Sequence, residues 1–324
     1  MSTPPAPRRH RRAAGQLLLG LVPVLVVGLV ALLLLALRLP AARAPLAAAT
    51  STAQATVSAT GGAPDGRTLT VSFTDGHGRE RTGELLLPRR VDVPTGSAVT
   101  VRYNPDPDPD AAGPDPIPVH TDGDTAHRRL SDLVFGLVAV AVVLVVVSGL
   151  TALRLVTRPR LRRRPPTRVT ATHVVSRQGL GVRSWLELGT PVGLRWLPVH
   201  WAPELDRLAP DTALQVHGDP GRDRLVLPVV GGTEVWPSGR VRSRTPRGDV
   251  RQAAVDPDAR DLGLARQARA DGVVPFVAPV LGLLWAYVDG SGVGGFLLAT
   301  ALSAAVLFWL PQLLGSDPRA TSRR

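Results

Sequence analysis

The sequence predicts a multi-pass α-helical membrane protein with four spans and two small all-β domains, one on each side of the membrane. Three observations predict this fold class. Four apolar runs have the length and composition of membrane helices. The arginine content of the segments between them alternates, and two of those segments show the alternating pattern of strands.

The amino-acid composition excludes several kinds of chemistry. The 324 residues contain no Cys, which excludes disulfides, thiolate catalysis and thiolate metal sites. They contain no Lys either, so all 38 basic residues are Arg and the formal net charge is +12. Such a charge favours anionic partners, among them phospholipid headgroups, nucleic acid and acidic proteins.

The apolar runs come in two pairs. Residues 17–37 and 133–153 are each 21 uncharged residues, about 31 Å as a helix, so we expect spans over 16–38 and 131–156. Two shorter runs predict spans over 273–288 and 293–314. Only one charge, Asp289, lies between Asp271 and Asp317, which indicates a helical hairpin.

The net charge of each segment between the spans predicts on which side of the membrane that segment lies. The tail 1–15 carries +4, residues 38–132 carry −2, residues 154–272 carry +9, the hairpin tip carries −1 and the tail 315–324 carries +2. This is the positive-inside pattern of a plasma-membrane protein with both termini in the cytoplasm. A cleaved signal peptide is the alternative for the first run, but its apolar core exceeds the usual length.

An arginine block follows the second span. We expect it to retain that end of the helix in the cytoplasm and to bind anionic headgroups. Its members are Arg158, Arg160, Arg162, Arg163 and Arg164. Nucleic acid is the less favoured partner, because the block adjoins a span and no recognition helix follows.

The extracytoplasmic β-domain is expected over 50–105, with strands near 55–60, 67–73, 82–87 and 97–103 forming a small sheet or partial barrel. An Asp/Pro-rich linker, 106–130, follows. The spacing of Asp106, Asp108 and Asp110 would suit calcium, but the alternating prolines favour a stiff spacer.

Four metal-ligating side chains stand just before the second span. They are His120, Asp122, Asp124 and His127. Histidine and carboxylate are ligand types that zinc accepts, although this spacing matches no defined site. They are the candidate metal residues of the sequence.

The cytoplasmic β-domain is expected over 167–245. Four of its residues, Trp185, Trp196, Trp201 and Trp236, suit the core of a small sheet better than a platform for single-stranded nucleic acid. Residues 256–272 predict an amphipathic helix or linker that exposes its arginines to water or headgroups, with Leu262 and Leu264 on the other face.

Two short stretches hint at a relation between the β-domains. AVTVRYNP (98–105) and ALQVHGDP (213–220) share a hydrophobic-x-Val core and a following Asn/Asp-Pro turn. Eight positions leave duplication and chance both open.

The first half of the chain also carries a Phe-x-Asp turn and a Gly-x-x-Val-x-Val-x-Tyr-Asn-Pro strand. These are Phe73-Thr74-Asp75-Gly76 and Gly96-Ser97-Ala98-Val99-Thr100-Val101-Arg102-Tyr103-Asn104-Pro105. Residues 17–156 thereby resemble an uncharacterised actinobacterial membrane-protein family, domain of unknown function 3592. The resemblance implies a β-domain between two spans and no catalytic residue.

No catalytic or cofactor motif is present. The GSGVGG at 290–295 matches Gly-x-Gly-x-x-Gly, but it follows an apolar helix instead of a strand, so a dinucleotide site is not expected. Two hypotheses follow. The leading one is a non-enzymatic envelope interaction or signal-relay scaffold, and the alternative is a membrane-bound enzyme or metal-dependent factor that uses the His120–His127 cluster.

Overall fold

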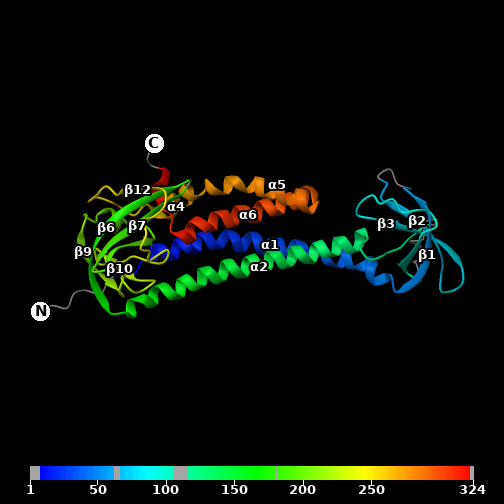
Figure 1. The fold of residues 1–324 in the computed structure, drawn as a ribbon, viewed down its shortest axis with the longest axis horizontal. Helices are drawn as coiled ribbons and strands as arrows, with labels where there is room; N and C mark the ends of the chain where they lie inside the picture. Colours follow the sequence, from blue (N-terminus) through cyan, green and yellow to red (C-terminus); the bar gives the residue numbers. More distant parts are fainter. Residues whose placement is uncertain (1–7, 62–65, 106–115, 180, 322–324) are drawn as a thin grey trace. The chain divides into compact units, whose positions relative to one another are not determined.

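The computed structural model describes residues 8–61, 66–105, 116–179 and 181–321, and it divides into two compact units. One unit is Val30–Val142 and the other comprises the residues up to Leu29 and those from Val143 onward. The helices are α1 (Arg11–Ala48), α2 (Thr125–Arg160), α3 (Pro203–Asp206), α4 (Gly263–Asp271), α5 (Ala278–Asp289) and α6 (Gly292–Leu314), with short 3-10 turns η1 (Leu161–Arg163), η2 (Val274–Val277) and η3 (Pro318–Thr321) (Figure 1).

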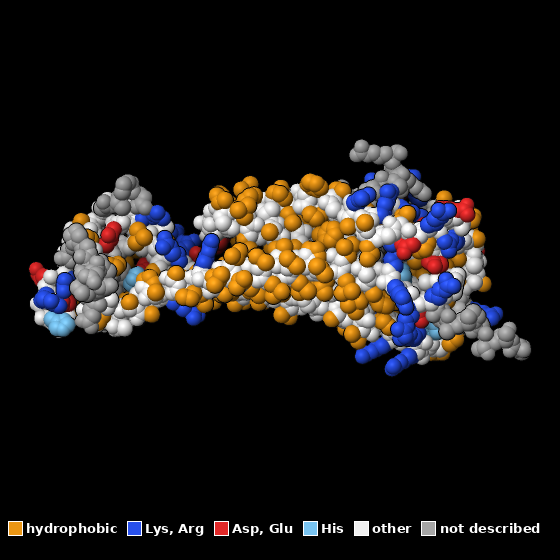
Figure 2. All heavy atoms as spheres, turned by 180° about the vertical axis from the view of Figure 1, so that it is seen from behind, with side chains coloured by type: hydrophobic (Ala, Val, Ile, Leu, Met, Phe, Trp, Pro, Cys, Tyr) orange, Lys and Arg blue, Asp and Glu red, His pale blue; other side chains and the backbone are white. Residues whose placement is uncertain are grey.

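Four helical segments are long and apolar enough to cross a membrane, as the sequence predicted. They are Arg11–Ala48, Thr125–Arg163, Gly263–Asp289 and Gly292–Leu314. Large apolar side chains on them face outward: Val145 is 71% exposed and Phe276 is 79% exposed. In Figure 2 such side chains cover the visible surface of the helices, an arrangement that water disfavours and lipid accepts.

The Val30–Val142 unit holds a small β-barrel, which we call the first barrel. Its strands are β1 (Ser51–Thr60), β2 (Thr68–Thr74), β3 (Glu80–Leu86), β4 (Ala98–Tyr103) and β5 (Ile117–Pro118), in the order β4-β1-β2-β3-β5. β5 pairs in parallel with β3, and the backbones of His120 and Arg102 exchange two hydrogen bonds, so the sheet closes back onto β4. This is the connectivity of the five-stranded OB-fold.

The closing strand corrects the predicted linker. Residues 117–120 belong to the barrel, and α2 already begins at Thr125, so a linker over 106–130 is too long. The signal was hidden because the strand is only two residues long and one of them is proline. Asp106, Asp108 and Asp110 lie outside the described residues.

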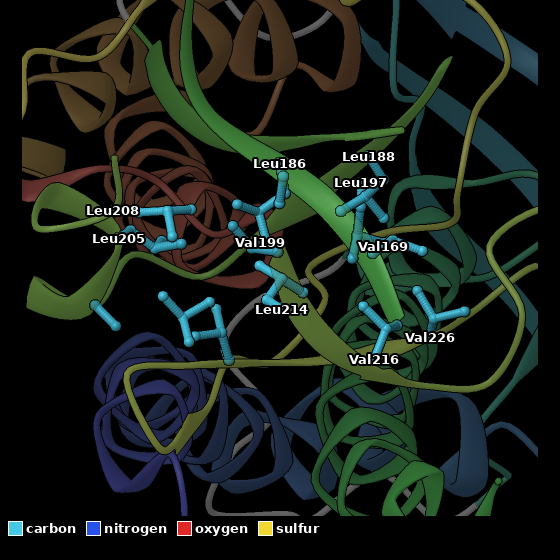
Figure 3. Packing of buried hydrophobic residues seen from close by; sticks show 14 residues of the cluster. Val169, Leu186, Leu188, Leu197, Val199, Leu205, Leu208, Leu214, Val216 and Val226 are labelled. Carbon is cyan, nitrogen blue, oxygen red and sulfur yellow. The ribbon is translucent and has the colours of Figure 1, made fainter. Parts of the chain in front are cut away.

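The other unit holds the second β-domain, built on β6 (Pro166–Gln178), β7 (Gly181–Thr190), β8 (Gly193–Val199), β9 (Thr212–His217), β10 (Leu227–Val230), β11 (Thr233–Glu234) and β12 (Asp249–Gln252). The order is β11-β10-β9-β6-β7-β8, and β12 pairs with β6. Hydrogen bonds from Trp196 to Arg242 and from Val241 to Arg224 place residues 235–242 between β8 and β10, so this sheet also curls round its core. Figure 3 shows that core, with Leu186, Leu197 and Val216 fully buried.

The two repeated stretches occupy matching places in the two β-domains. β4 and β9 are each the fourth strand of their domain, and each pairs antiparallel with the first strand. Val99 lies opposite Ala55, and its counterpart Leu214 lies opposite Val169. The two domains therefore share the pairing of their first and fourth strands.

Residues 256–272 differ from the expected amphipathic helix in two ways. The helix begins only at Gly263, because turns at Asp256 and Asp261, each with a side chain bonded to the amide two residues on, occupy the first half. Its buried residues are Gln267, Ala270 and Asp271, whereas Leu262 and Leu264 are more than a third exposed. Gln267 and Asp271 thus point inward, whereas Arg269 is exposed as expected.

The helices pack through small residues. Gly282 of α5 lies against Thr300 of α6, where a Cβ on Gly282 would stand 2.0 Å from the Thr300 Oγ1 and 3.0 Å from the Phe296 carbonyl oxygen. Gly294, also on α6, faces open space. Close approach at a glycine is typical of membrane helix pairs.

Gly282→Ala should therefore separate α5 from α6 and lower the free energy of unfolding by about 1–3 kcal/mol, the cost of overpacking. Thermal unfolding in detergent measures this, with Gly294→Ala as the matched control. Equal melting temperatures for the two variants would show that α5 and α6 do not pack at Gly282.

Candidate functional site

The structure brings three of the four predicted metal residues together. Asp124 lies directly before α2 and is buried; its carboxylate contacts His120 Nδ1 at 2.7 Å and His127 Nδ1 at 3.0 Å. It also accepts the His127 backbone amide at 2.8 Å, which is the bond of a helix N-cap. Asp122 is exposed and stands apart from the hydrogen-bonded group.

This arrangement favours the charged form of the Asp124 carboxylate. Burial alone would raise the pKa of Asp124, but the bonds from His127 and His120 outweigh burial and lower it. Over the ranges that the structure describes, no group of three or more His, Asp or Glu side chains could hold a metal ion. The cluster therefore has a clear local role, capping α2 and fixing the end of the first barrel.

The arginine block divides into internal and exposed members. Arg158 is 7% exposed, and Arg164 bonds the Leu225 carbonyl and pairs with Asp223 at 3.0 Å. The exposed members are Arg160, Arg162 and Arg163. Figure 2 shows arginines gathered where the helices meet the second β-domain. Of the five residues, only these three are free to meet headgroups.

A buried polar cluster joins α1, α4 and α6, and we call it the junction. One oxygen of Asp271 accepts hydrogen bonds from Gln267 at 2.7 Å, Gln312 at 2.5 Å and the Ser316 hydroxyl at 2.8 Å. Gln16 of α1 donates to Ser316 at 3.3 Å. Each of these side chains is 5% exposed or less. Three donors on one buried oxygen link α4 to α6 and to the residue that follows α6.

Two arginines donate hydrogen bonds to the carbonyl groups at the C-terminal end of α6. The last carbonyls of a helix have no partner inside the helix. Arg154 of α2 donates to the carbonyls of Leu313 and Ser238, and Arg183 of β7 donates to that of Leu314 at 3.1 Å. Cations are favoured at this end of the helix dipole. α6 is thus tied to α2 and to the sheet at once.

The residues after α6 continue into the second β-domain, and we call Ser316–Arg319 the strap. The Asp317 amide donates to the Val182 carbonyl at 2.9 Å, and its carboxylate accepts from the Ser184 hydroxyl at 2.9 Å. Arg319 pairs with Asp317 at 2.7 Å and with Asp206 at 2.6 Å. The strap carries the junction directly into the sheet.

Charge in the strap region is strongly perturbed. Burial raises the pKa of Asp206 to about 6 even though Arg319 opposes the shift. Burial, helped by Arg319, lowers the pKa of the neighbouring His173 to about 4. Burial would also raise the pKa of Asp317, but the hydrogen bonds and charge of Arg319 outweigh it and lower it. The Asp317 carboxylate therefore stays charged to lower pH than an ordinary aspartate, whereas the Asp206 carboxylate binds a proton at higher pH.

Little in the sequence points to these residues. Gln267 and Asp271 fall in the expected amphipathic helix or linker without a predicted role, and Asp317 and Arg319 fall in the expected tail. The available signal was that Gln16 and Gln312 are amides at the ends of apolar runs, where unpaired polar groups are costly. Their partners could not be known without the fold.

The two stretches behind the family resemblance also meet. The Tyr103 hydroxyl accepts the Gly76 amide at 2.9 Å, and its ring lies 4.9 Å from that of Phe73. The hydrogen bond from the Arg79 amide, together with bonds from the His77 amide and the Arg81 guanidinium, lowers the pKa of Asp75 to about 2. These residues shape a turn of the first barrel and form no reactive group.

Comparisons with family models, with curated proteins and with solved structures find no match. The resemblance of residues 17–156 to domain of unknown function 3592 stays a prediction.

Asp206 predicts a pH dependence with a definite sign. Its pKa is raised on folding, so its contribution to stability is full below about pH 4 and is lost as the pH rises to about 6. The lowered pKa of His173 acts in the opposite direction over about pH 4 to 6.5. Asp206→Asn should remove the first effect and leave the second, making the rise in stability with pH steeper by up to about 3 kcal/mol.

Denaturation of the full chain in nanodiscs at several pH values measures this slope. Asp258→Asn, at an exposed carboxylate, is the control and should match the wild type. A slope that Asp206→Asn leaves unchanged would mean that the Asp206 carboxylate is not desolvated.

Proposed function

We propose that this chain is an integral plasma-membrane protein with both termini in the cytoplasm, and that it acts as a non-enzymatic envelope scaffold or signal relay. The single observation that carries the relay is the junction, where Asp271 joins α4, α6 and the strap through buried hydrogen bonds. A change in helix packing must move the strap, and the strap is bonded to β7.

Charge supports the proposed sides. Residues 154–272, which include the whole second β-domain, carry +9, and the first barrel lies in the segment of −2. Retention of an arginine-rich segment on the inner side is the general rule for membrane proteins. Under this proposal the first barrel meets extracytoplasmic partners, the second β-domain meets cytoplasmic ones, and Arg160, Arg162 and Arg163 contact anionic headgroups.

A relay can work without catalysis. Coupling between two sites needs an element with two arrangements whose balance each site can bias. Here the helices, junction, strap and β7 form a continuous chain of buried contacts within one unit. A partner that alters the packing of the helices would thereby alter the sheet.

The absence of cysteine makes the sides directly measurable. Three exposed serines suit this test: Ser72 on β2, Ser243 between β11 and β12 of the second β-domain, and Ser291 at the hairpin tip. Single Ser→Cys variants labelled in intact cells with an impermeant maleimide should react at positions 72 and 291 and stay unlabelled at 243 until the membrane is opened. The reverse pattern would contradict the proposed orientation.

The relay predicts that damage at the junction reaches the sheet. Asp271→Leu leaves the Gln312 amide and the Ser316 hydroxyl without their carboxylate acceptor, at about 1–3 kcal/mol for each unsatisfied group. Hydrogen exchange of the strap and of the first residues of β7 should then quicken at least tenfold, since about 1.4 kcal/mol corresponds to that factor. Asp289→Asn, at the hairpin tip, is the control.

Mass spectrometry of the full chain in nanodiscs resolves these peptides. Faster exchange confined to α4 and α6, with the strap and β7 as slow as in the wild type, would count against the relay.

A further inference from the structure

A pocket of about 270 Å³ opens beside the strap, close to the lower size limit of small-molecule sites. It is formed by β6, the start of β7, β12 and the strap. The charged side chains lining it are Arg177, Asp249, Arg251, Asp317 and Arg319, and its apolar ones are Val175, Val182 and Ala253. All of these elements belong to one compact unit.

Strand register explains why the charges converge. β6 and β12 run antiparallel, with Arg177 opposite Asp249 and Val175 opposite Arg251. Opposed residues and those two apart lie on the same face of a sheet. The alternate residues Val174 and Ser176 are buried on the other face. One face of this two-stranded ribbon thus presents two guanidinium groups to the pocket.

The balance of charge favours an anion. Arg251 pairs with Asp249 at 2.8 Å, and Arg319 pairs with Asp317 at 2.7 Å. Both carboxylates are therefore engaged. In the part of the chain that the structure describes, the Arg177 guanidinium makes no ion pair, so it is the positive charge in excess. The fork of a guanidinium matches a carboxylate or phosphate group in two parallel hydrogen bonds.

We propose that this pocket binds a small anionic ligand through a carboxylate or phosphate group held by Arg177 and Arg251. The three apolar side chains leave room for a short uncharged portion of the ligand. A phosphorylated solute and the phosphate of a lipid headgroup share this chemistry.

Because the pocket lies against the strap, a bound ligand would act on the strap. Asp317 and Arg319 form one wall, and they follow α6 directly. A bound anion changes the field at Arg319, which holds both Asp206 and Asp317. The ligand would act on the strap, and this effect, though not the binding itself, rests on the proposed relay.

Titration of inorganic phosphate into the full chain, in nanodiscs of zwitterionic lipid at constant ionic strength, tests the site by calorimetry. We expect saturable binding of one phosphate. Arg177→Gln and Arg251→Gln should each weaken it at least tenfold, because a hydrogen bond to a charged group is lost. Arg168→Gln, at an exposed arginine at the other end of β6, should leave it unchanged.

A second arm separates the two sources. In nanodiscs that contain phosphatidylglycerol, loss of phosphate binding identifies the headgroup as the occupant, and unchanged binding identifies a soluble anion; either result supports the site. No saturable binding in zwitterionic lipid, or equal weakening by Arg168→Gln, overturns it. A negative phosphate titration would overturn the pocket but would not change the hydrogen exchange expected after Asp271→Leu. The two experiments therefore test the pocket and the relay independently.

Discussion

A helix that crosses a membrane must satisfy its backbone polar groups within itself or against its neighbours, and this constraint accounts for the main features of the four long helical segments. The large hydrophobic side chains exposed on α1, α2, α5 and α6 are mostly Leu and Val. Polar groups are tolerated only where the helices enclose them or where they end. Gln267, Gln312 and Ser316 satisfy this requirement together, because each donates to the buried carboxylate of Asp271.

The same constraint explains how the second β-domain is attached. α6 ends in carbonyls that need donors, and the donors come from α2 and β7 through Arg154 and Arg183. The chain then turns at Gly315, whose φ of 71° suits glycine, and its next residues bond to β7. Hydrogen bonds therefore connect the end of α6 to Arg154, to Arg183 and to the first residues of β7. The pocket proposed to bind an anion lies beside them.

Sequence alone predicted the parts of the fold that depend on local pattern. Apolar runs located the four helices, and alternation located most strands, including β4 and β9. It missed β5 and β12, which are short and carry no alternation, because their pairing comes from strands distant in sequence. A strand of two residues is defined by its neighbours and not by its own composition.

The site shows the same division. His120, Asp124 and His127 lie within eight positions, so their proximity was predictable, and so was the exposure of part of the arginine block. The junction was not, because Gln16 and Ser316 are 300 residues apart and meet only in the folded chain. Helical pattern correctly placed Arg269 of α4 on an exposed face, but it could not predict the burial of Gln267 and Asp271, because Gln312 and Ser316, which bond to them, are distant in sequence.

The most direct test of this account is the partition of the full-length chain between membrane and soluble fractions of lysed cells after an alkaline carbonate wash. Four helices with apolar outer surfaces predict that all of the chain stays in the membrane pellet and leaves it only with detergent. Recovery of a monodisperse, folded chain in the detergent-free supernatant would contradict it.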